Sequence, residues 1–158
     1  MRTGRDEPEV ASGTEPARVL IEMVDPRGYL RSLEGKTRGR AVWMLLDLAL
    51  AGYGRVKVRA GRRSLEEEER LYGQGRDGAA CRMAAVPERF ACPELGQVVW
   101  CRPEDSKHVR GEALDLDLSA YKAVSYSVIG AIGELCGFTW GGRWRVKDYG
   151  HFELGKDS

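Results

Sequence analysis

The two histidines of this chain lie far apart in the sequence, and each has a carboxylate at a short offset. Asp115 follows His108 by seven residues, and Asp148 precedes His151 by three. Two imidazoles and one carboxylate form a zinc site with one position left open for water, and a second carboxylate can serve as the base. A fold that uses these groups together must bring two distant segments to one point.

The composition is that of a soluble globular protein of 158 residues, which is enough for one domain with a real core. The 25 basic and 24 acidic residues nearly cancel, so no overall field favours nucleic acid or a membrane surface. The first ten residues have no apolar core of the secretory kind, and no apolar run is long enough to span a bilayer. We therefore expect synthesis in the cytoplasm, no nucleic-acid partner, no stable membrane association and a monomer.

The polar start of the chain predicts a mobile N-terminal arm over residues 1–17, followed by a single domain over residues 18–158. Within the domain, residues 77–105 form a cysteine-containing insert with Cys81, Cys92 and Cys101. Free thiols are expected in a reducing compartment, and a disulfide among the three is the alternative after export. The insert has no C-x-x-C spacing that would favour a second zinc site.

Apolar residues at helical spacing predict helices over residues 37–51, with Thr37 as the cap, and over residues 121–136. Ser64 and Glu67 fit a capping box, which predicts a helix from Leu65 to about Tyr72. The four consecutive glutamates of this helix, residues 66–69, are interpreted as a solvated first turn. The Trp and Leu residues of the first helix are interpreted as core.

Alternation of apolar and polar residues predicts strands over residues 55–60, 98–100, 111–119 and 151–154. In the third of these, Leu114 and Leu116 share one face, while Asp115 and Asp117 share the other. Two aspartates on one face of a leucine-rich strand call for an explanation, and coordination of a cation would provide it. The cationic face of the strand over residues 55–60 is interpreted as solvated, with a nucleic-acid patch as the alternative.

The residues that can supply zinc chemistry form a complete set. His108, Asp115 and His151 can be the three protein ligands, because neutral imidazole and carboxylate suit a hydrolytic zinc site. Asp148 can take a proton from the bound water and hand it to the leaving amine. Arg63 is a cation that could stabilise the oxyanion.

The pattern S-x-H-x-x-G-x-A-x-D over residues 106–115, followed by D-x-x-H over residues 148–151, resembles the zinc peptidases of bacterial cell walls. These are the D-alanyl-D-alanine carboxypeptidases of the VanY type and their relatives, the L-alanyl-D-glutamate endopeptidases found as phage endolysins. Residues 138–142, which read F-T-W-G-G, resemble the endopeptidase branch. So do G-R-R-S at residues 61–64 and L-Y-G-Q-G-R at residues 71–76.

The resemblance implies a small α+β domain in which helices pack on an antiparallel sheet that carries a Zn²⁺ site. It implies that His108, Asp115 and His151 bind the zinc, and that Asp148 is the catalytic base. Arg63 would bind the scissile carbonyl or its oxyanion, and Ser106 would help to position the substrate. The domain over residues 18–158 would then be a zinc peptidase domain.

The sequence thus predicts a zinc-dependent, endolysin-like and bacteriolytic peptidase that cleaves peptidoglycan stem peptides, most simply as an L-alanyl-D-glutamate endopeptidase acting on the wall after release. A D,D-carboxypeptidase is the nearest alternative, and Arg62, Arg76, Arg82 or Arg110 could supply its pocket for a free carboxylate. A catalytically silent zinc-stabilised module that binds wall or peptide is another, although such a module has no use for a base at Asp148. A nucleic-acid-binding protein built on the cationic strand is the third, and the balanced charge argues against it.

Overall fold

A four-stranded antiparallel sheet organises the structure, a computed structural model that describes residues 15–155. The strand order is β1-β2-β4-β3. The strands are β1 (Lys57–Ala60), β2 (Ala113–Asp117), β3 (Phe138–Trp140) and β4 (His151–Leu154). Helices pack against this sheet, so the predicted α+β class is confirmed.

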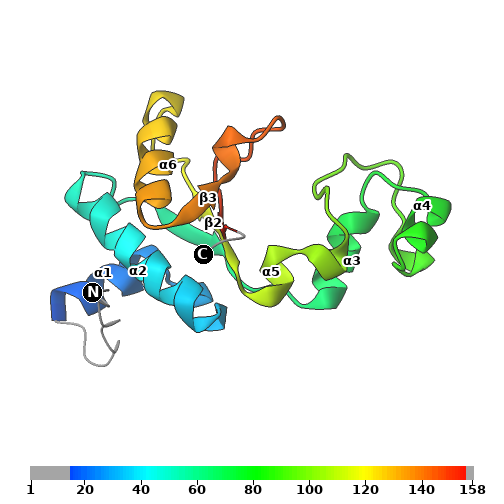
Figure 1. Cartoon of the computed structure of the whole chain (residues 1–158), viewed down its shortest axis with the longest axis horizontal. Helices are drawn as coiled ribbons and strands as arrows, with labels where there is room; N and C mark the ends of the chain where they lie inside the picture. The colour runs from blue at the N-terminus through cyan, green and yellow to red at the C-terminus, as the bar shows by residue number, and fades with distance from the viewer. Residues whose placement is uncertain (1–14, 156–158) are drawn as a thin grey trace, which may run out of the picture.

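Three helices pack close to the sheet on one side of the molecule: α1 (Glu15–Val24), α2 (Gly35–Leu50) and α6 (Tyr126–Leu135). Figure 1 shows that α3 (Leu65–Gly73) and α4 (Gly78–Met83) lie instead in a lobe at the far end of the long axis, with α5 (Lys107–Arg110) between the two parts. Short 3₁₀ helices complete the elements: η1 (Tyr29–Ser32), η2 (Glu88–Phe90), η3 (Pro103–Asp105), η4 (Ala123–Ser125) and η5 (Gly141–Arg143). None of the helices described is long and apolar enough to cross a membrane.

The main core lies between α2, α6 and the leucine face of β2. Leu114 and Leu116 are buried on that face and belong to one cluster with Met44 and Leu48 of α2 and Phe152 of β4. Because side chains alternate along a strand, the same geometry sends Asp115 to the opposite face. The predicted division of this strand into a core face and an aspartate face is therefore confirmed.

A second, smaller core holds the lobe together. Cys81, Ala84 and Val86 are buried there, with Phe90 packed against them. A Cβ atom on Gly73 would come within 1.9 Å of the Phe90 carbonyl oxygen, so only glycine permits this approach. The four cysteines are unpaired in the structure.

The N-terminal caps of α3 and α2 differ in how well the sequence predicts them. Ser64 and Glu67 form the predicted capping box at α3. At α2 the predicted cap is wrong: the Glu34 carboxylate accepts hydrogen bonds from the backbone N–H groups of Lys36 and Thr37, and Thr37 itself is buried inside the helix. A glutamate can replace the usual cap because its oxygen reaches the same unpaired N–H groups.

Other expectations need correction. Residues 98–100 form no strand, and α6 begins at Tyr126 rather than near residue 121, because η4 occupies the preceding turn. Trp43 and Leu50 of α2 are exposed rather than part of the core. The predicted arm over residues 1–17 falls mostly outside the described residues. Its last three residues, from Glu15, instead form the start of α1.

The two faces of α2 allow a matched test of the packing. Leu48 is 1% exposed and Leu50 is 87% exposed on the same helix. We expect Leu48→Ala to lower the free energy of unfolding by about 2–5 kcal/mol, because it removes buried methyl groups and leaves a cavity. Leu50→Ala should change it by no more than about 0.5 kcal/mol. Urea unfolding followed by circular dichroism measures both, and equal losses would contradict the assigned orientation of α2.

Candidate metal centre

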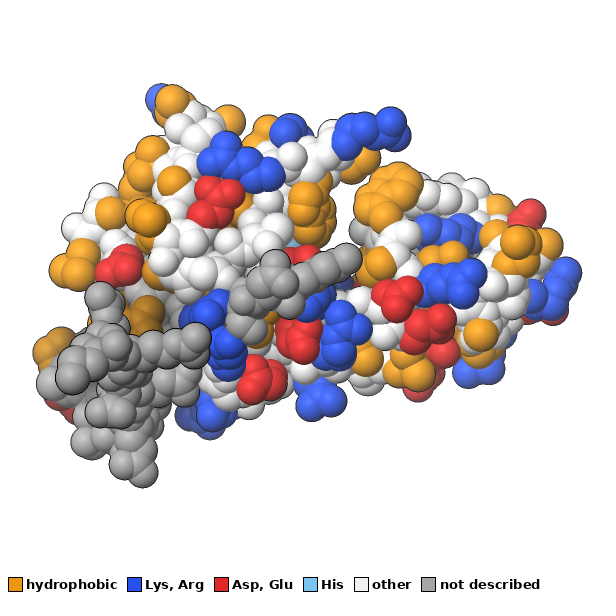
Figure 2. Space-filling model, in the orientation of Figure 1, with side chains coloured by type: hydrophobic (Ala, Val, Ile, Leu, Met, Phe, Trp, Pro, Cys, Tyr) orange, Lys and Arg blue, Asp and Glu red, His pale blue; other side chains and the backbone are white. Residues whose placement is uncertain are grey.

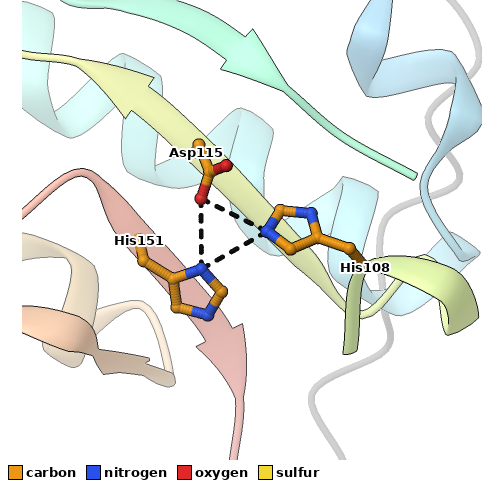
Figure 3. A group of neighbouring side chains, drawn as sticks. All are labelled: His108, Asp115 and His151. Carbon is orange, nitrogen blue, oxygen red and sulfur yellow. Dashed lines mark hydrogen bonds and ion pairs between the residues drawn. The ribbon is translucent and has the colours of Figure 1, made fainter. Parts of the chain in front are cut away.

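Two histidines and one aspartate meet at the face of the sheet opposite the leucine core (Figure 3). Asp115 Oδ1 lies 3.2 Å from His108 Nε2 and 3.1 Å from His151 Nδ1, and the two nitrogens lie 3.3 Å apart. All three side chains are buried. Within residues 15–155, no other group of three such side chains converges closely enough to hold a metal ion.

The sheet register and one short helix create this convergence. Asp115 and His151 are directly opposed partners in the antiparallel pair of β2 and β4, so their side chains share one face. His108 comes from α5, which ends at Gly111 with a backbone φ of 74°. This left-handed turn, which favours glycine, redirects the chain from α5 into β2 and lets His108 face Asp115.

Hydrogen bonds behind the histidines decide which ring nitrogens face the centre with a lone pair. The Gly61 carbonyl can only accept, so His108 Nδ1, 2.7 Å away, carries the proton and Nε2 is left as an acceptor. His151 Nε2 lies 2.9 Å from a carboxylate oxygen of Glu153, which assigns the proton to Nε2 in the neutral ring and the lone pair to Nδ1. Such outer contacts orient metal-binding imidazoles in general.

The aspartate is held from behind by an arginine. The Arg63 guanidinium donates to Asp115 Oδ2 at 2.7 Å and to Glu68 at 3.1 Å, which leaves Asp115 Oδ1 directed at the histidines. Glu68 is 1% exposed, so the interpretation of all four glutamates as a solvated turn is wrong for this residue. Its burial is compatible with charge because the carboxylate is paired with Arg63.

Three acceptors that face one another at this distance repel unless a positive charge lies between them. Burial favours the neutral form of His151, but hydrogen bonds to Asp115 and Glu153 outweigh burial and raise the pKa of His151 to about 9. Burial likewise opposes the charge of Asp115, yet its close contacts with His108 and His151 hold the pKa of Asp115 well below the usual range. A cation that binds here takes the place of a proton.

The donor set fits a tetrahedral metal ion. Metal–ligand bonds of about 2.0–2.1 Å at tetrahedral angles place neighbouring ligand atoms about 3.3 Å apart. The three measured separations, 3.1 to 3.3 Å, match this spacing. Three protein ligands would leave a fourth position directed to the cleft.

The centre opens into a cleft of about 890 Å³ between the sheet and the lobe. Figure 2 shows a hollow in the surface with hydrophobic side chains on both sides. Val98 and Trp100 line the cleft from the insert, and Trp144 and Val146 line it from the loop between β3 and β4. Residues 98–100, although not a strand, are therefore part of the cleft wall.

The remaining predicted site residues also line this cleft. Asp148 is exposed, and its backbone is fixed by hydrogen bonds that join its N–H to the Gly141 carbonyl and its carbonyl to the N–H of His151. A Cβ on Gly141 would lie 2.5 Å from the Asp148 carbonyl oxygen, so this close approach requires glycine. Ser106 is buried and lines the same cavity.

The four arginines considered for a carboxylate pocket all have other partners. Arg62 donates to the Val109 carbonyl, Arg76 to the carbonyls of Tyr72 and Val99, Arg82 pairs with Glu88, and Arg110 pairs with Glu112. Only Arg110 among the four lines the cleft. The contributions of Glu68 and Glu153 were missed, because sequence spacing carries no signal for a partner on another element.

The comparison with protein families agrees with this geometry. Residues 101–154, which include all three converging side chains, match the model of the D-alanyl-D-alanine carboxypeptidase family. The match covers about a third of the chain. Over this segment it confirms the family resemblance predicted from the sequence, and together with the converging His and Asp side chains it supports the prediction of a metallopeptidase.

A solved structure similar to this one is the L-Ala D-Glu endopeptidase ChiX of Serratia marcescens. The two chains are 21% identical, with a TM-score of 0.48 over 85% of this chain and 92% of ChiX. No curated protein matches the chain.

The Glu153 contact can be tested through metal affinity. Glu153→Ala should weaken Zn²⁺ binding about 10- to 100-fold, because His151 loses the acceptor that orients its ring. Glu153→Gln keeps an acceptor oxygen and should bind zinc more tightly than the alanine variant. Competition with a chromogenic chelator measures the zinc dissociation constants of both variants. An alanine variant with unchanged affinity would show that Glu153 does not support metal binding.

Proposed function

We propose that this chain is a zinc-dependent peptidase that cleaves peptidoglycan stem peptides in the bacterial wall, acting as an L-alanyl-D-glutamate endopeptidase. The observation that carries the proposal is the convergence of His108, Asp115 and His151 at the floor of a cleft that also exposes Asp148. The family match over residues 101–154 supports a peptidase of wall peptides.

The chain's own residues divide the work of hydrolysis. His108, Asp115 and His151 would hold Zn²⁺, which supplies Lewis acidity toward water and the scissile carbonyl. Asp148, exposed in the cleft, would accept the proton of the attacking water and deliver it to the leaving amine. Both transfers need a carboxylate that can reach water and substrate in turn, and an exposed loop position allows this.

Arg63 would contribute in two ways. Its hydrogen bond to Asp115 Oδ2 keeps the other oxygen aimed at the centre. Its positive charge, which borders the cleft, would also stabilise negative charge that develops on the carbonyl oxygen. Ser106 would help to position the substrate from its place in the cleft lining.

Two features support the endopeptidase over the carboxypeptidase. The F-T-W-G-G run over residues 138–142 resembles the endopeptidase branch. The cleft also has walls on two sides of the centre, which suits a peptide that continues beyond the cleaved bond. The D,D-carboxypeptidase is kept as the second candidate, because the matching family is described by that activity.

Digestion of purified peptidoglycan, with and without a zinc chelator, tests the proposal when the new ends are identified by mass spectrometry. We expect new L-alanine carboxyl ends and D-glutamate amino ends that disappear with the chelator and return with added Zn²⁺. Release of terminal D-alanine alone would replace the endopeptidase with the carboxypeptidase. No cleavage at one bound zinc per chain would favour the silent binding module.

Asp148→Ala tests the assigned base in the same assay. Loss of general base catalysis should lower kcat by at least about 100-fold, while zinc binding remains because Asp148 is outside the ligand trio. Arg145→Ala is the matched control, since Arg145 is an exposed residue of the same loop that does not line the cleft. An Asp148→Ala enzyme with full activity would contradict the role given to this residue.

A further inference from the structure

One arginine of β1, next to a shift in the strand register, lies beside the metal centre. Lys57 pairs with Asp117 and Val58 with Leu116, but the next pair joins Ala60, not Arg59, to Asp115. Arg59 is therefore an extra residue in β1, as in a β-bulge. Bulges redirect a side chain and are frequent next to active sites.

The Arg59 side chain reaches the cleft without a close partner there. Its Nη2 atom lies 4.0 Å from Asp115 Oδ2, an oxygen that Arg63 already contacts at 2.7 Å. The side chain is 62% exposed and lines both the main cleft and an adjoining hollow of about 230 Å³ that Asp148 also borders. Within residues 15–155, the Arg59 guanidinium makes no hydrogen bond shorter than 3.5 Å.

The other cations of the cleft lining differ from Arg59 in a way that matters for ligand binding. Arg63 is shared between Asp115 and Glu68, while Lys107 and Arg110 both pair with Glu112. Lys147 is exposed on the loop that carries Asp148 and also lines the cleft. Arg59 thus combines unused donors with a position one side chain away from a metal-binding carboxylate.

We propose that Arg59 binds the free α-carboxylate of the substrate residue on the amine side of the cleaved bond. The inference rests on the proposed function and specifies the substrate of the same site. In a stem peptide, D-glutamate is joined onward through its γ-carboxyl group, so its α-carboxylate is free. A terminal D-alanine carries the same group in the same place.

The geometry of the peptide suits this assignment. The α-carboxylate is separated from the scissile carbonyl carbon by three bonds, which is a span of about 4 Å at most. A substrate whose carbonyl lies at the metal centre must therefore place this carboxylate within the immediate surroundings of Asp115, where Arg59 lies. The planar guanidinium can bind both carboxylate oxygens at once. Arg59 is accordingly a specificity residue and takes no part in proton transfer.

Two matched peptides test the proposal on the zinc-loaded full chain. One is N-acetyl-L-alanyl-γ-D-glutamyl-L-lysine, in which the α-carboxylate of D-glutamate is free. The other is the same peptide with an α-carboxamide on D-glutamate. We expect the wild type to prefer the carboxylate peptide by about tenfold in kcat/KM, the value of one charged hydrogen bond. Arg59→Gln should lose this preference, so that the ratio of the kcat/KM values for the two peptides falls to about one.

A binding measurement separates recognition from turnover. The product γ-D-glutamyl-L-lysine should inhibit the wild type more strongly than its α-carboxamide, and Arg59→Gln should be inhibited equally by both. Arg145→Gln removes an exposed positive charge outside the cleft lining and should behave as wild type. Since Arg59 is exposed, its replacement should leave the core intact, and circular dichroism of the variant checks this.

The outcomes are distinguishable from failure of the proposed function. A preference that survives in Arg59→Gln overturns the inference, and one lost instead in Lys147→Gln assigns the carboxylate to Lys147. A parallel pair, N-acetyl-L-lysyl-D-alanyl-D-alanine and its C-terminal amide, covers the carboxypeptidase. Cleavage of that pair alone, with a preference that depends on Arg59, rejects the endopeptidase and supports Arg59. Cleavage of no peptide by the wild type rejects both proposals.

Discussion

The organisation of this protein depends on three ligand atoms, two imidazole nitrogens and one carboxylate oxygen, whose lone pairs face one another. Asp115 and His151 are opposed across β2 and β4, and His108 is added from α5. Such an arrangement is repulsive without a cation or a proton between the atoms, so the site favours a positive charge, as the raised pKa of His151 shows. The Gly61 carbonyl, Arg63 and Glu153 each hold the far side of one ligand. Buried polar networks of this kind are stable only when every member has a partner.

The cleft around the centre depends on close backbone approaches. The loop between β3 and β4 returns over the sheet, where Gly141 and Gly150 leave no room for a Cβ atom against the carbonyls of Asp148 and Leu116. The indole N–H of Trp140 donates to the Tyr149 carbonyl and fixes the same loop. These glycines therefore serve as packing contacts, and they bring the proposed base to the edge of the metal centre.

The positions of Glu68 and Arg59 could not be predicted from the sequence. Glu68 belongs to a run of four glutamates that resembles a solvated helix start, yet it is buried because Arg63 lies between it and Asp115. Arg59 belongs to a cationic strand face that resembles ordinary solvated surface, yet it lies near Asp115 and lines the cleft. In both cases the deciding neighbour is on another element, and local spacing contains no information about it.

The sequence by itself determined the candidate metal ligands, the leucine and aspartate faces of β2, the capping box of α3 and the resemblance to a peptidase family. These depend on local periodicity or on short motifs, whose physical causes act within a few residues. Only the tertiary structure decided that Asp115 opposes His151, that Arg63 is shared by two carboxylates and that Trp43 faces solvent. These outcomes depend on strand register and helix orientation, which are set by the packing of the whole chain and not by neighbouring residues.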